Sequence, residues 1–571
     1  MDREYMLWKT WKECTLEDEE IQEELSAMAD KEEEISDSFY RELEFGTGGL
    51  RGVLGAGTNR MNVYTVAKAT QGYADYLKKR QEMPSVAIAY DSRIKSDRFA
   101  QTAAEVFAAN GIRVYLYREL MPTPSLSYAV RCLGCSGGIV ITASHNPAKY
   151  NGYKVYGADG GQITSEAASQ ILEEISKLDI FSDIKKLSFE EGIKREIITY
   201  IEDSVIDAYI QQVSAQALCK DEIDKSVSIV YTPLNGAGLK CVLRVLKENG
   251  FTNISVVKEQ EYPDGNFPTC PYPNPEIREA MELGIQYAKA QNSDLLLATD
   301  PDCDRVGIAV RKDGGYQLLN GNQVGILLLN YICKRRLELR KMPENPIIVK
   351  TIVTTDITKK IAKHYGVKVI EVLTGFKYIG EQIGLLEEKG EESRYIFGFE
   401  ESYGYLSGGF VRDKDAVNGS LLICEMFAYY QSQGRNLLDV LDELYDKFGY
   451  CLTTLHSYQF EGKAGFRKMQ SFMQSMRENR PDTLGGLNVE AMEDYREQTR
   501  TFIDGRKESI TGLPASNVLK FLLEGESSCV VRPSGTEPKL KLYLSVTGND
   551  REKADNQEKQ IVKNIEALLE N

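Results

Sequence analysis

The sequence predicts an α/β protein built from three similar α/β domains in tandem, followed by a smaller α+β domain. Its 571 residues exceed what one hydrophobic core usually supports. Short apolar, β-rich segments alternate with helical segments in three successive series, which is typical of parallel α/β sheets. Each series ends its last strand in a polar loop, and ligand sites of such sheets lie beyond the carboxyl ends of strands.

The N-terminal region, residues 5–40, is predicted to be an acidic amphipathic helical arm packed on the first domain. Its apolar positions are Trp8, Trp11, Ile21 and Leu25. The glycine-rich segment Phe45–Gly52 that follows is expected to form a loop rather than a helix.

The three series then give the expected strands and helices. Strands are expected over Ser85–Tyr90, Arg113–Tyr117, Gly138–Ile141, Val227–Tyr231, Asn253–Val257, Asp294–Ala298, Pro346–Lys350, Val367–Val372 and Tyr395–Phe397. Helices are expected over 98–110, 238–249, 277–291, 356–365 and 377–388.

The C-terminal part has a different pattern. A helical stretch over 421–448 and a hydrophilic region over 460–512 precede Val530–Leu544, a loop flanked by strand residues, and a helix over 551–569. The expected division is an arm (1–40), domain 1 (41–205), domain 2 (206–318), domain 3 (319–450) and domain 4 (451–571).

Composition narrows the function classes. The apolar fraction of 42% and charged fraction of 27% are ordinary for a globular protein. A net charge of −16 without a basic run argues against nucleic acid, although a few cations focused in a cleft still allow small anionic substrates. No apolar leader or long apolar run is present, so we expect a cytoplasmic protein without a membrane partner. The oligomeric state is left open.

Cysteine and histidine usage indicates no zinc or disulfide framework. Eleven scattered cysteines are typical of reduced thiols in a cytosolic protein. Cys132 and Cys135 form a lone C-x-x-C, interpreted as thiols in a helix rather than a metal or redox site. The histidines His145, His364 and His456 are too scattered for a histidine-rich site.

The first polar loop, Thr142-Ala143-Ser144-His145-Asn146-Pro147, follows the apolar run Gly138–Ile141. It presents the Ser144 hydroxyl at the end of a buried strand, where a nucleophile is both accessible and held in place. Read alone, such a serine is more often a turn or cap residue. The other loops change that interpretation.

The second loop carries Asp300, Asp302 and Asp304 at alternate positions after an apolar strand. Three hard oxygen ligands suit Mg²⁺. An EF-hand is rejected because Arg305 and Lys312 occupy its glycine and glutamate positions and a strand leads in. A solvated acidic turn is the alternative, which the mutual repulsion of the carboxylates disfavours.

Two further loops complete the pattern. Glu400-Glu401-Ser402 offers carboxylates and a hydroxyl that suit a polyol, with a charged surface turn as the alternative. Arg532–Lys539 has the composition of a phosphate cradle, with an ordinary turn as the alternative. A nucleophile, a divalent cation, a polyol contact and a phosphate cradle together indicate phosphoryl transfer on a phosphorylated sugar.

The segments TASHNP, DPDCDR, FEES and RPSGTEPK, in this order, resemble the four signature loops of the α-D-phosphohexomutase family, and the resemblance spans residues 40–571. Phe45–Gly52 and Ala89–Arg93 also resemble its first-domain segments. The arm, the length and GFEES are most similar to the longer branch with phosphoglucomutases and phosphopentomutases. The resemblance implies four domains around a central cleft.

The resemblance also implies roles for individual residues. Ser144 is the expected phosphoserine and a metal ligand with Asp300, Asp302 and Asp304. Arg51 is expected to stabilise the transferring phosphoryl group, and Lys154 to act as general acid/base with its pKa lowered by the cleft. His145 is a weaker candidate for proton transfer. The expected substrate contacts are Glu400, Ser402, Lys377, Arg305, Arg532, Ser534, Gly535 and Thr536.

Two positions depart from the family pattern. Phe399 stands where many relatives have glycine before the acidic pair, which affects the expected shape of the sugar pocket. Cys303 stands where glycine is frequent between the last two metal ligands, and its side chain is expected to point away from the ion.

The sequence therefore predicts a Mg²⁺-dependent mutase that interconverts glucose 1-phosphate and glucose 6-phosphate through a phosphoserine, with glucose 1,6-bisphosphate as intermediate and activator. The fourth domain is expected to close over the intermediate. Phosphopentomutase or phosphomannomutase activity would use the same residues, and a sugar 1,6-bisphosphate synthase would release the intermediate. A non-catalytic sugar-phosphate sensor is the alternative of a different class.

Overall fold

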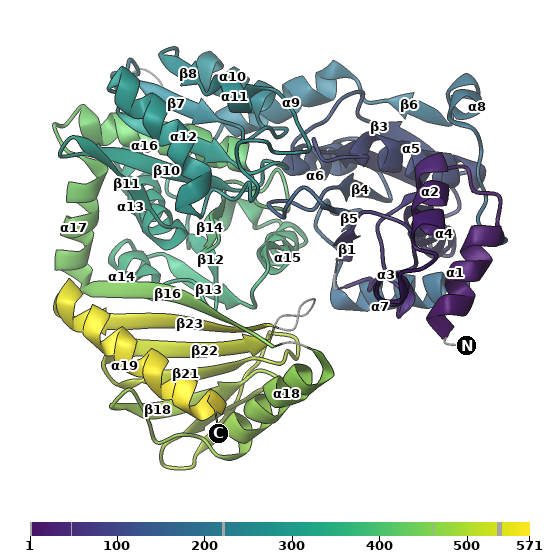
Figure 1. The fold of residues 1–571 in the computed structure, drawn as a ribbon. Helices are drawn as coiled ribbons and strands as arrows, with labels where there is room; N and C mark the ends of the chain where they lie inside the picture. The colour runs from purple at the N-terminus through teal and green to yellow at the C-terminus, as the bar shows by residue number, and fades with distance from the viewer. Residues whose placement is uncertain (1–2, 47, 220–222, 461, 534–538, 571) are drawn as a thin grey trace. The chain divides into compact units, whose positions relative to one another are not determined.

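A computed structural model describes residues 3–46, 48–219, 223–460, 462–533 and 539–570 (Figure 1). The chain forms two compact units. The first comprises residues 1–320, 379–395 and 402–432, and the second comprises residues 321–378, 396–401 and 433–571. None of the helices in the described ranges has the length and apolar character that a membrane crossing requires.

The N-terminal arm is helical and packs on the first domain, as predicted. It consists of α1 (Arg3–Glu13), α2 (Glu19–Ala27) and α3 (Glu32–Phe39). The Trp8 indole donates to the Leu25 carbonyl at 2.9 Å, and the buried Trp11 ring lies edge-on to Phe39, Tyr64 and Phe181. The arm therefore shares the core of the first sheet.

The first sheet has the strand order β1-β5-β4-β2-β3-β6. Its strands are β1 (Gly49–Val53), β2 (Ser85–Tyr90), β3 (Arg113–Leu116), β4 (Gly137–Ile141), β5 (Tyr150–Gly157) and β6 (Ile198–Tyr200). Strands β2, β3, β4 and β6 are parallel, whereas β5 and β1 add antiparallel pairs. The associated helices are α4 (Val63–Lys78), α5 (Ser96–Ala109), α6 (Thr123–Cys132), α7 (Ser165–Ser176) and α8 (Phe189–Lys194).

The glycine-rich segment is only partly a loop, because β1 forms its second half. Gly49 has φ of 139°, and a Cβ there would stand 1.8 Å from the Tyr153 carbonyl oxygen on β5. Glycine therefore permits the close antiparallel approach of β1 to β5. Arg51 lies on this strand opposite Gly152, rather than on a free loop.

The second sheet has the order β11-β10-β9-β7-β8 and is also mixed, with β9, β10 and β11 antiparallel. Its strands are β7 (Ile229–Thr232), β8 (Ile254–Val256), β9 (Leu295–Thr299), β10 (Val306–Lys312) and β11 (Gly315–Leu319). The remaining elements of the first unit include α9 (Asp203–Ser214), α10 (Leu239–Glu248), α11 (Lys258–Glu261), α12 (Arg278–Gln291), β15 (Gly404–Leu406) and α16 (Ala416–Gln431).

The second unit contains strands of the third sheet. In it, β13 (Lys368–Val372) pairs with β12 (Ile347–Thr351), and β14 (Tyr395–Glu400) lies on the other side of β12. Its helices include α13 (Gly321–Glu338), α14 (Ile357–His364) and α17 (Leu437–Phe448); α15 (Phe376–Glu387) begins here. The predicted helical stretch 421–448 is thus two helices, α16 and α17.

The C-terminal part of the second unit is an α+β domain with an antiparallel sheet in the order β16-β23-β22-β21-β18-β19-β20 and β17 paired with β18. The strands are β16 (Tyr450–Gln459), β17 (Thr483–Leu484), β18 (Leu487–Asp494), β19 (Thr499–Phe502), β20 (Lys507–Ser509), β21 (Leu519–Leu523), β22 (Ser527–Pro533) and β23 (Lys539–Gly548). Helices α18 (Gly462–Glu478) and α19 (Arg551–Glu570) pack against it around one core.

The architecture confirms three α/β sheets followed by an α+β domain. Two details differ from the prediction. The sheets are mixed rather than purely parallel, because β5 and β10 turn back beside the strands that carry the polar loops. The hydrophilic region 460–512 also holds regular structure, because α18 exposes its polar residues and buries Met469, Met473 and Met476.

Candidate functional site

Ser144 lies at the end of β4 in a strained backbone conformation. Its φ is 51°, in the left-handed region that non-glycine residues rarely adopt. The backbone N–H donates to Thr142 Oγ1 at 2.8 Å, and the buried Oγ donates to Asp300 Oδ2 at 2.8 Å. Such strain persists where the surroundings impose it, and here it directs the hydroxyl at the aspartates.

Arg93 holds the loop that carries Ser144. Its buried guanidinium donates to the backbone carbonyls of Ser144 (2.5 Å), Asn146, Pro147 (3.0 Å) and Tyr150 (3.0 Å). Four carbonyls on one planar donor group fix the path of the loop. Burial lowers the pKa of Arg93, which Asp91 opposes, and the guanidinium stays charged.

Asp91 adds a second restraint on the same loop. Its Oδ2 accepts from Thr142 Oγ1 at 2.6 Å, and its Oδ1 accepts from the Arg93 N–H and the Ser96 hydroxyl at 2.9 Å each. Asp91 and Arg93 belong to the segment Ala89–Arg93, whose resemblance to the family predicted no role for either residue.

Asp300, Asp302 and Asp304 are buried together at the end of β9. One carboxylate oxygen of each lies within 4.8 Å of the others, the single such cluster of potential ligands in the described part of the chain. Burial, together with Asp304 and Asp302, raises the pKa of Asp300 well above its ordinary value. Burial also opposes ionisation of Asp304, but Lys154, Lys414 and Arg305 lower its pKa.

These residues fit a hard divalent cation. Asp302 Oδ1 and Asp304 Oδ1 are buried and accept no hydrogen bond. Buried carboxylate oxygens without donors are costly, and oxygen-only ligand sets are those that Mg²⁺ prefers. Cys303 has φ of 53°, which explains why glycine suits this position, and its sulphur packs toward Gly238, inside the second domain, as expected.

Two ammonium groups lie against the aspartates. Lys154 Nζ is 2.7 Å from Asp302 Oδ2 and 3.1 Å from Asp304 Oδ2, and Lys414 Nζ is 2.8 Å from Asp304 Oδ2. Burial lowers the pKa of Lys154, but Asp302 and Asp304 more than offset this, so its pKa is raised. The expectation that the cleft lowers this pKa is therefore wrong for this arrangement, because two carboxylates stabilise the ammonium.

The other basic residues that the sequence predicts for the site, within the first unit, lie around the loops of Ser144 and the aspartates. His145 Nδ1 is 3.2 Å from Ser144 Oγ, and burial lowers the pKa of His145 well below its usual value. Arg51 donates to the Asn146 side chain at 3.3 Å. Arg305 pairs with Glu276 and lies 3.8 Å from Asp304 Oδ1.

Within the first unit, the polar loop that contains Ser402 and Tyr403 approaches the loop that carries the three aspartates. Val306 N–H, directly after Arg305, donates to the Tyr403 carbonyl at 3.1 Å. Tyr403 has φ of 64°, so this loop, like those of Ser144 and Cys303, carries a non-glycine residue in the left-handed region. Ser402 is half-buried immediately before it.

Glu400, Lys377 and Arg532 belong to the second unit. Glu400 is buried and accepts the Gly375 N–H at 2.9 Å, two residues before Lys377. Burial raises the pKa of Tyr543, as do Glu401 and Glu400, while a hydrogen bond from Arg532 lowers it. The segments that carry Glu400 and Arg532 thus share Tyr543 as a neighbour. The predicted contacts Ser534, Gly535 and Thr536 lie outside the described residues.

Phe399 occupies the core rather than the sugar pocket. Its fully buried ring stacks on Phe397 at a centroid distance of 5.5 Å and lies against Gly325 of α13. A Cβ at Gly325 would stand 2.1 Å from Phe399 Cε2. The departure from the family pattern is therefore accommodated by a glycine on the facing helix.

Sequence reasoning missed Lys414 and assigned no role to Arg93. Lys414 lies in Arg412-Asp413-Lys414-Asp415, a run of charges between a glycine-rich turn and an apolar helix. All four side chains are buried. The signal that could have identified Lys414 was a run of charged residues leading directly into an apolar helix. Such a run is expected to be buried, and buried charges need partners of opposite sign.

The chain is similar to known proteins over most of its length. Four family models match in order: the phosphoglucomutase/phosphomannomutase alpha/beta/alpha domains I (residues 42–180), II (207–315) and III (320–448), and the C-terminal domain (482–564). A phosphoglucomutase of Staphylococcus haemolyticus (strain JCSC1435) is 38% identical over 509 residues, covering 89% of this chain and 91% of its own. One of Staphylococcus aureus (strain N315) is 39% identical over 521 residues, covering 90% and 91%.

Solved structures show the same fold. The Paramecium pp63/parafusin (phosphoglucomutase) in its open form is 18% identical, with a TM-score of 0.66, and 93% of this chain and 95% of that chain are covered. A phosphoglucomutase/phosphomannomutase family protein from Burkholderia thailandensis is 17% identical, with a TM-score of 0.66 and coverage of 92% and 97%. With four ordered domain matches and relatives 38–39% identical over most of its length, this chain belongs to the phosphoglucomutase/phosphomannomutase family, the α-D-phosphohexomutases, and is a phosphosugar mutase.

Proposed function

We propose that the protein interconverts glucose 1-phosphate and glucose 6-phosphate through phosphorylated Ser144. The observation that carries this proposal is the Ser144 hydroxyl, 2.8 Å from Asp300 within a buried cluster of three aspartates. The curated relatives with 38–39% identity are named phosphoglucomutases, which supports glucose as the sugar.

Asp300, Asp302 and Asp304, with an oxygen on Ser144, would hold Mg²⁺. When bound, the ion would neutralise charge on phosphoryl oxygens. Arg51 supplies a further positive charge toward the same loop, and Arg93 keeps Ser144 in its attacking position.

Two phosphoryl transfers complete a turnover. In the first, the bond between Ser144 Oγ and phosphorus breaks as the free 6-hydroxyl of glucose 1-phosphate bonds to phosphorus. The sugar hydroxyl loses its proton and Ser144 Oγ gains one. In the second, Ser144 Oγ loses its proton and bonds to the phosphorus of the 1-phosphate of the bound 1,6-bisphosphate as the bond between that phosphorus and the sugar O1 breaks. The sugar O1 gains a proton, glucose 6-phosphate is released and the phosphoserine is restored.

Proton transfer at Ser144 Oγ is assigned to His145, whose Nδ1 lies 3.2 Å away. Lys154 is the candidate for the sugar oxygens. As the ammonium that Asp302 and Asp304 stabilise, it can donate a proton to the sugar O1 that leaves in the second transfer, and the neutral amine so formed can accept the proton of the sugar hydroxyl in the next first transfer. Glu400, Ser402 and Lys377 are the proposed sugar contacts. Arg532, with Ser534, Gly535 and Thr536, is the proposed site for the phosphate that is not transferred.

Glucose 1,6-bisphosphate is proposed as the activator, because unphosphorylated Ser144 needs a phosphoryl donor before the first turnover. Enzyme treated with a phosphatase should be inactive until a catalytic amount of the bisphosphate is added. A lag that the bisphosphate removes is the expected kinetic signature.

The substrate is tested by a coupled assay that compares glucose 1-phosphate, mannose 1-phosphate and ribose 1-phosphate. We expect the largest kcat/KM with glucose 1-phosphate and no turnover by Ser144→Ala. A higher kcat/KM with either other sugar would replace glucose in the proposal. Undiminished turnover by Ser144→Ala would refute the covalent route, and net bisphosphate release from a phosphoryl donor would identify a synthase instead.

A further inference from the structure

The second unit contains a second group of buried charges. Lys350 Nζ is 3.0 Å from both Asp356 Oδ1 and Glu371 Oε1. Lys359 Nζ is 3.0 Å from Asp356 Oδ1 and 2.8 Å from Glu371 Oε2. Lys520 Nζ stands farther from the same two carboxylates, at 3.7 and 3.9 Å. Three ammonium groups, here called the lysine cluster, therefore share two carboxylates.

The neighbouring charges do not remove this excess. Arg500 is paired with Glu493, which also accepts the Tyr495 hydroxyl at 2.7 Å. Glu508 is paired with Arg506. With these pairs neutral, the region keeps one unbalanced positive charge. A buried charge is stabilised by a partner of opposite sign, so the lysine cluster is complementary to an anion.

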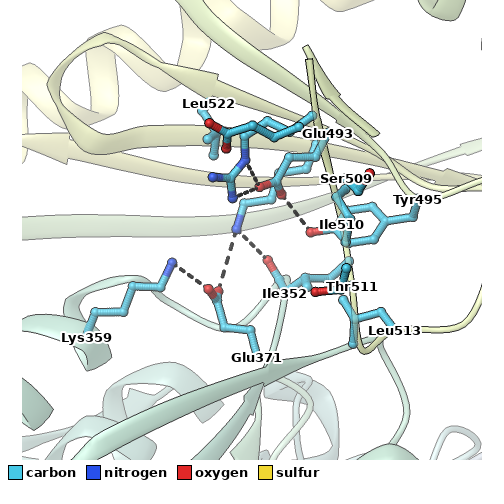
Figure 2. Close-up of a pocket in the computed structure, with 13 residues that line it drawn as sticks. Ile352, Lys359, Glu371, Glu493, Tyr495, Ser509, Ile510, Thr511, Leu513 and Leu522 are labelled. Atoms are coloured by element: carbon cyan, nitrogen blue, oxygen red, sulfur yellow. Dashed lines mark hydrogen bonds and ion pairs between the residues drawn. The ribbon is translucent and has the colours of Figure 1, made fainter. Parts of the chain in front are cut away.

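The lysine cluster opens into a cavity of about 290 Å³. One wall comes from the third sheet and α14 and carries Ile352, Glu371 and Lys359, as Figure 2 shows. The other wall is formed by strands of the C-terminal domain and by the segment that follows β20. The residues on that wall are Glu493, Tyr495, Arg500, Glu508, Ser509, Ile510, Thr511, Leu513, Lys520 and Leu522.

Lys520 has unused donor capacity at this cavity. The ammonium group has three donors, and it makes one hydrogen bond, to the Ile352 carbonyl at 3.1 Å. Its side chain is 3% exposed. The exposed hydroxyl residues Ser509 and Thr511 add donors beside the opening. These groups match an oxyanion, which accepts several hydrogen bonds at once.

The cavity also excludes other ligand classes. A metal cation would find the three carboxylates of the wall, Glu371, Glu493 and Glu508, already paired with lysine or arginine side chains. An apolar molecule would displace water from Lys359, Lys520 and Arg500 without replacing their hydrogen bonds. The volume exceeds that of a lone phosphate group and leaves room for a small organic portion beside Ile352, Leu513 and Leu522.

We propose that this cavity is a second binding site, separate from the phosphoryl-transfer site, for a small metabolite that carries a phosphate group. The phosphate lies on the cavity side of Lys520 and Lys359, whose ammonium groups also face Glu371, and the organic portion contacts the apolar wall. Lys520 also bonds the Ile352 carbonyl, and the preceding Thr351 hydroxyl donates to Glu401 at 3.3 Å. The site is therefore connected, through Ile352 and Thr351, with Glu401 of the proposed sugar loop.

Equilibrium dialysis of the full-length protein with ³²P-labelled inorganic phosphate tests this site at constant ionic strength. We expect the wild type to bind one phosphate per chain more than Lys520→Met or Lys359→Met at the same free concentration, a loss of affinity of at least about tenfold at that site. Lys363→Met, exposed on the same helix as Lys359, is the matched control and should bind like the wild type.

A variant that is expected to strengthen phosphate binding, rather than weaken it, makes the test more specific. Glu371→Gln increases the positive excess and should tighten phosphate binding at this site. Equal binding by the wild type, Lys520→Met and Lys359→Met would overturn the proposal, as would an equal loss in Lys363→Met. If Lys520→Met does not fold, Lys359→Met at the more exposed edge decides alone. Because binding rather than turnover is measured, the outcome does not depend on which sugar is the substrate.

Discussion

The two buried charge groups of this protein are built alike but have opposite imbalances. In the first unit, three aspartates lie together, two of them (Asp302 and Asp304) are in contact with the ammonium groups of Lys154 and Lys414, and two carboxylate oxygens accept no hydrogen bond. In the second unit, three lysines share Asp356 and Glu371. An excess of carboxylates selects a cation, and an excess of ammonium groups selects an anion.

The surroundings of the two groups also differ. The aspartates lie beside a strained serine whose loop is held by Arg93. Among the described residues that line the cavity at the lysine cluster, none is a comparable nucleophile. The hydroxyl residues there, Ser509 and Thr511, are exposed, and neither has the positive φ angle that Ser144 has. An imbalance of buried charge by itself, as in the lysine cluster, therefore indicates a ligand-binding site. The same imbalance beside a hydroxyl held in a strained conformation, as at Ser144, indicates a site of phosphoryl transfer.

The largest expected effect comes from the aspartates. Asp302→Asn keeps the shape but removes one ligand charge, so Mg²⁺-dependent turnover should fall by about 10³-fold or more, equivalent to about 4 kcal/mol. A coupled assay over a Mg²⁺ series, after chelation and re-addition, measures this. Asp313→Asn, exposed in the same domain, is the control. Wild-type turnover by Asp302→Asn at saturating Mg²⁺ would contradict the assignment.

Arg93→Lys tests the positioning of the nucleophile. A lysine cannot serve four backbone carbonyls at once, so kcat should fall about 10- to 100-fold while KM changes little. The stability should fall by about 2 kcal/mol in denaturant unfolding, since buried carbonyls lose donors. Arg98→Lys, on the helix that follows, should leave both quantities unchanged. A KM increase without a kcat decrease would assign Arg93 to substrate binding instead.

Gly325→Ala tests whether the sugar loop of the second unit depends on packing rather than charge. The new methyl group would collide with Phe399, so stability should fall by about 1–3 kcal/mol. Adding Phe399→Leu should recover part of this loss. Gly384→Ala is the matched control, because a Cβ there meets nothing within 4 Å. Equal melting temperatures of Gly325→Ala and the control would show that the contact is unimportant.

The smallest expected effect is on acid stability. Burial opposes ionisation of Glu371, but Lys350, Lys520 and Lys359 outweigh burial and the nearby Asp356, and its pKa is lowered to about 2. Its stabilising contribution is therefore present above its unfolded pKa of about 4.3 and is lost as the pH falls toward 2. Partial solvent exposure limits it to about 1 kcal/mol.

Glu371→Gln should remove this part of the pH dependence. Between pH 5 and pH 3 the melting temperature of the wild type should fall more steeply than that of the variant. Parallel curves for the two proteins would show that the carboxylate contributes nothing to acid stability.

The order of the elements was predictable from local patterns. Apolar runs such as Ser85–Tyr90 became strands with the same limits, because burial on both faces leaves a continuous apolar signal. Strands with mixed patterns were not predicted. Strand β5, which carries Lys154, contains glycine and polar residues whose burial is decided by the strands on either side of it. The division at residues 205, 318 and 450 stays a prediction.

The sequence by itself determined which chemical groups the polar loops present, because Ser144 and the three aspartates lie within short segments whose residue types already limit what they can do. Only the tertiary structure decided the partners of those groups. It placed Lys414, more than a hundred residues from Asp304, on that carboxylate, and it raised the pKa of Lys154 where the sequence predicted a lowered one. It also assembled the lysine cluster from residues 350–371 and 520. Electrostatic balance depends on distance in space, which local sequence patterns do not specify.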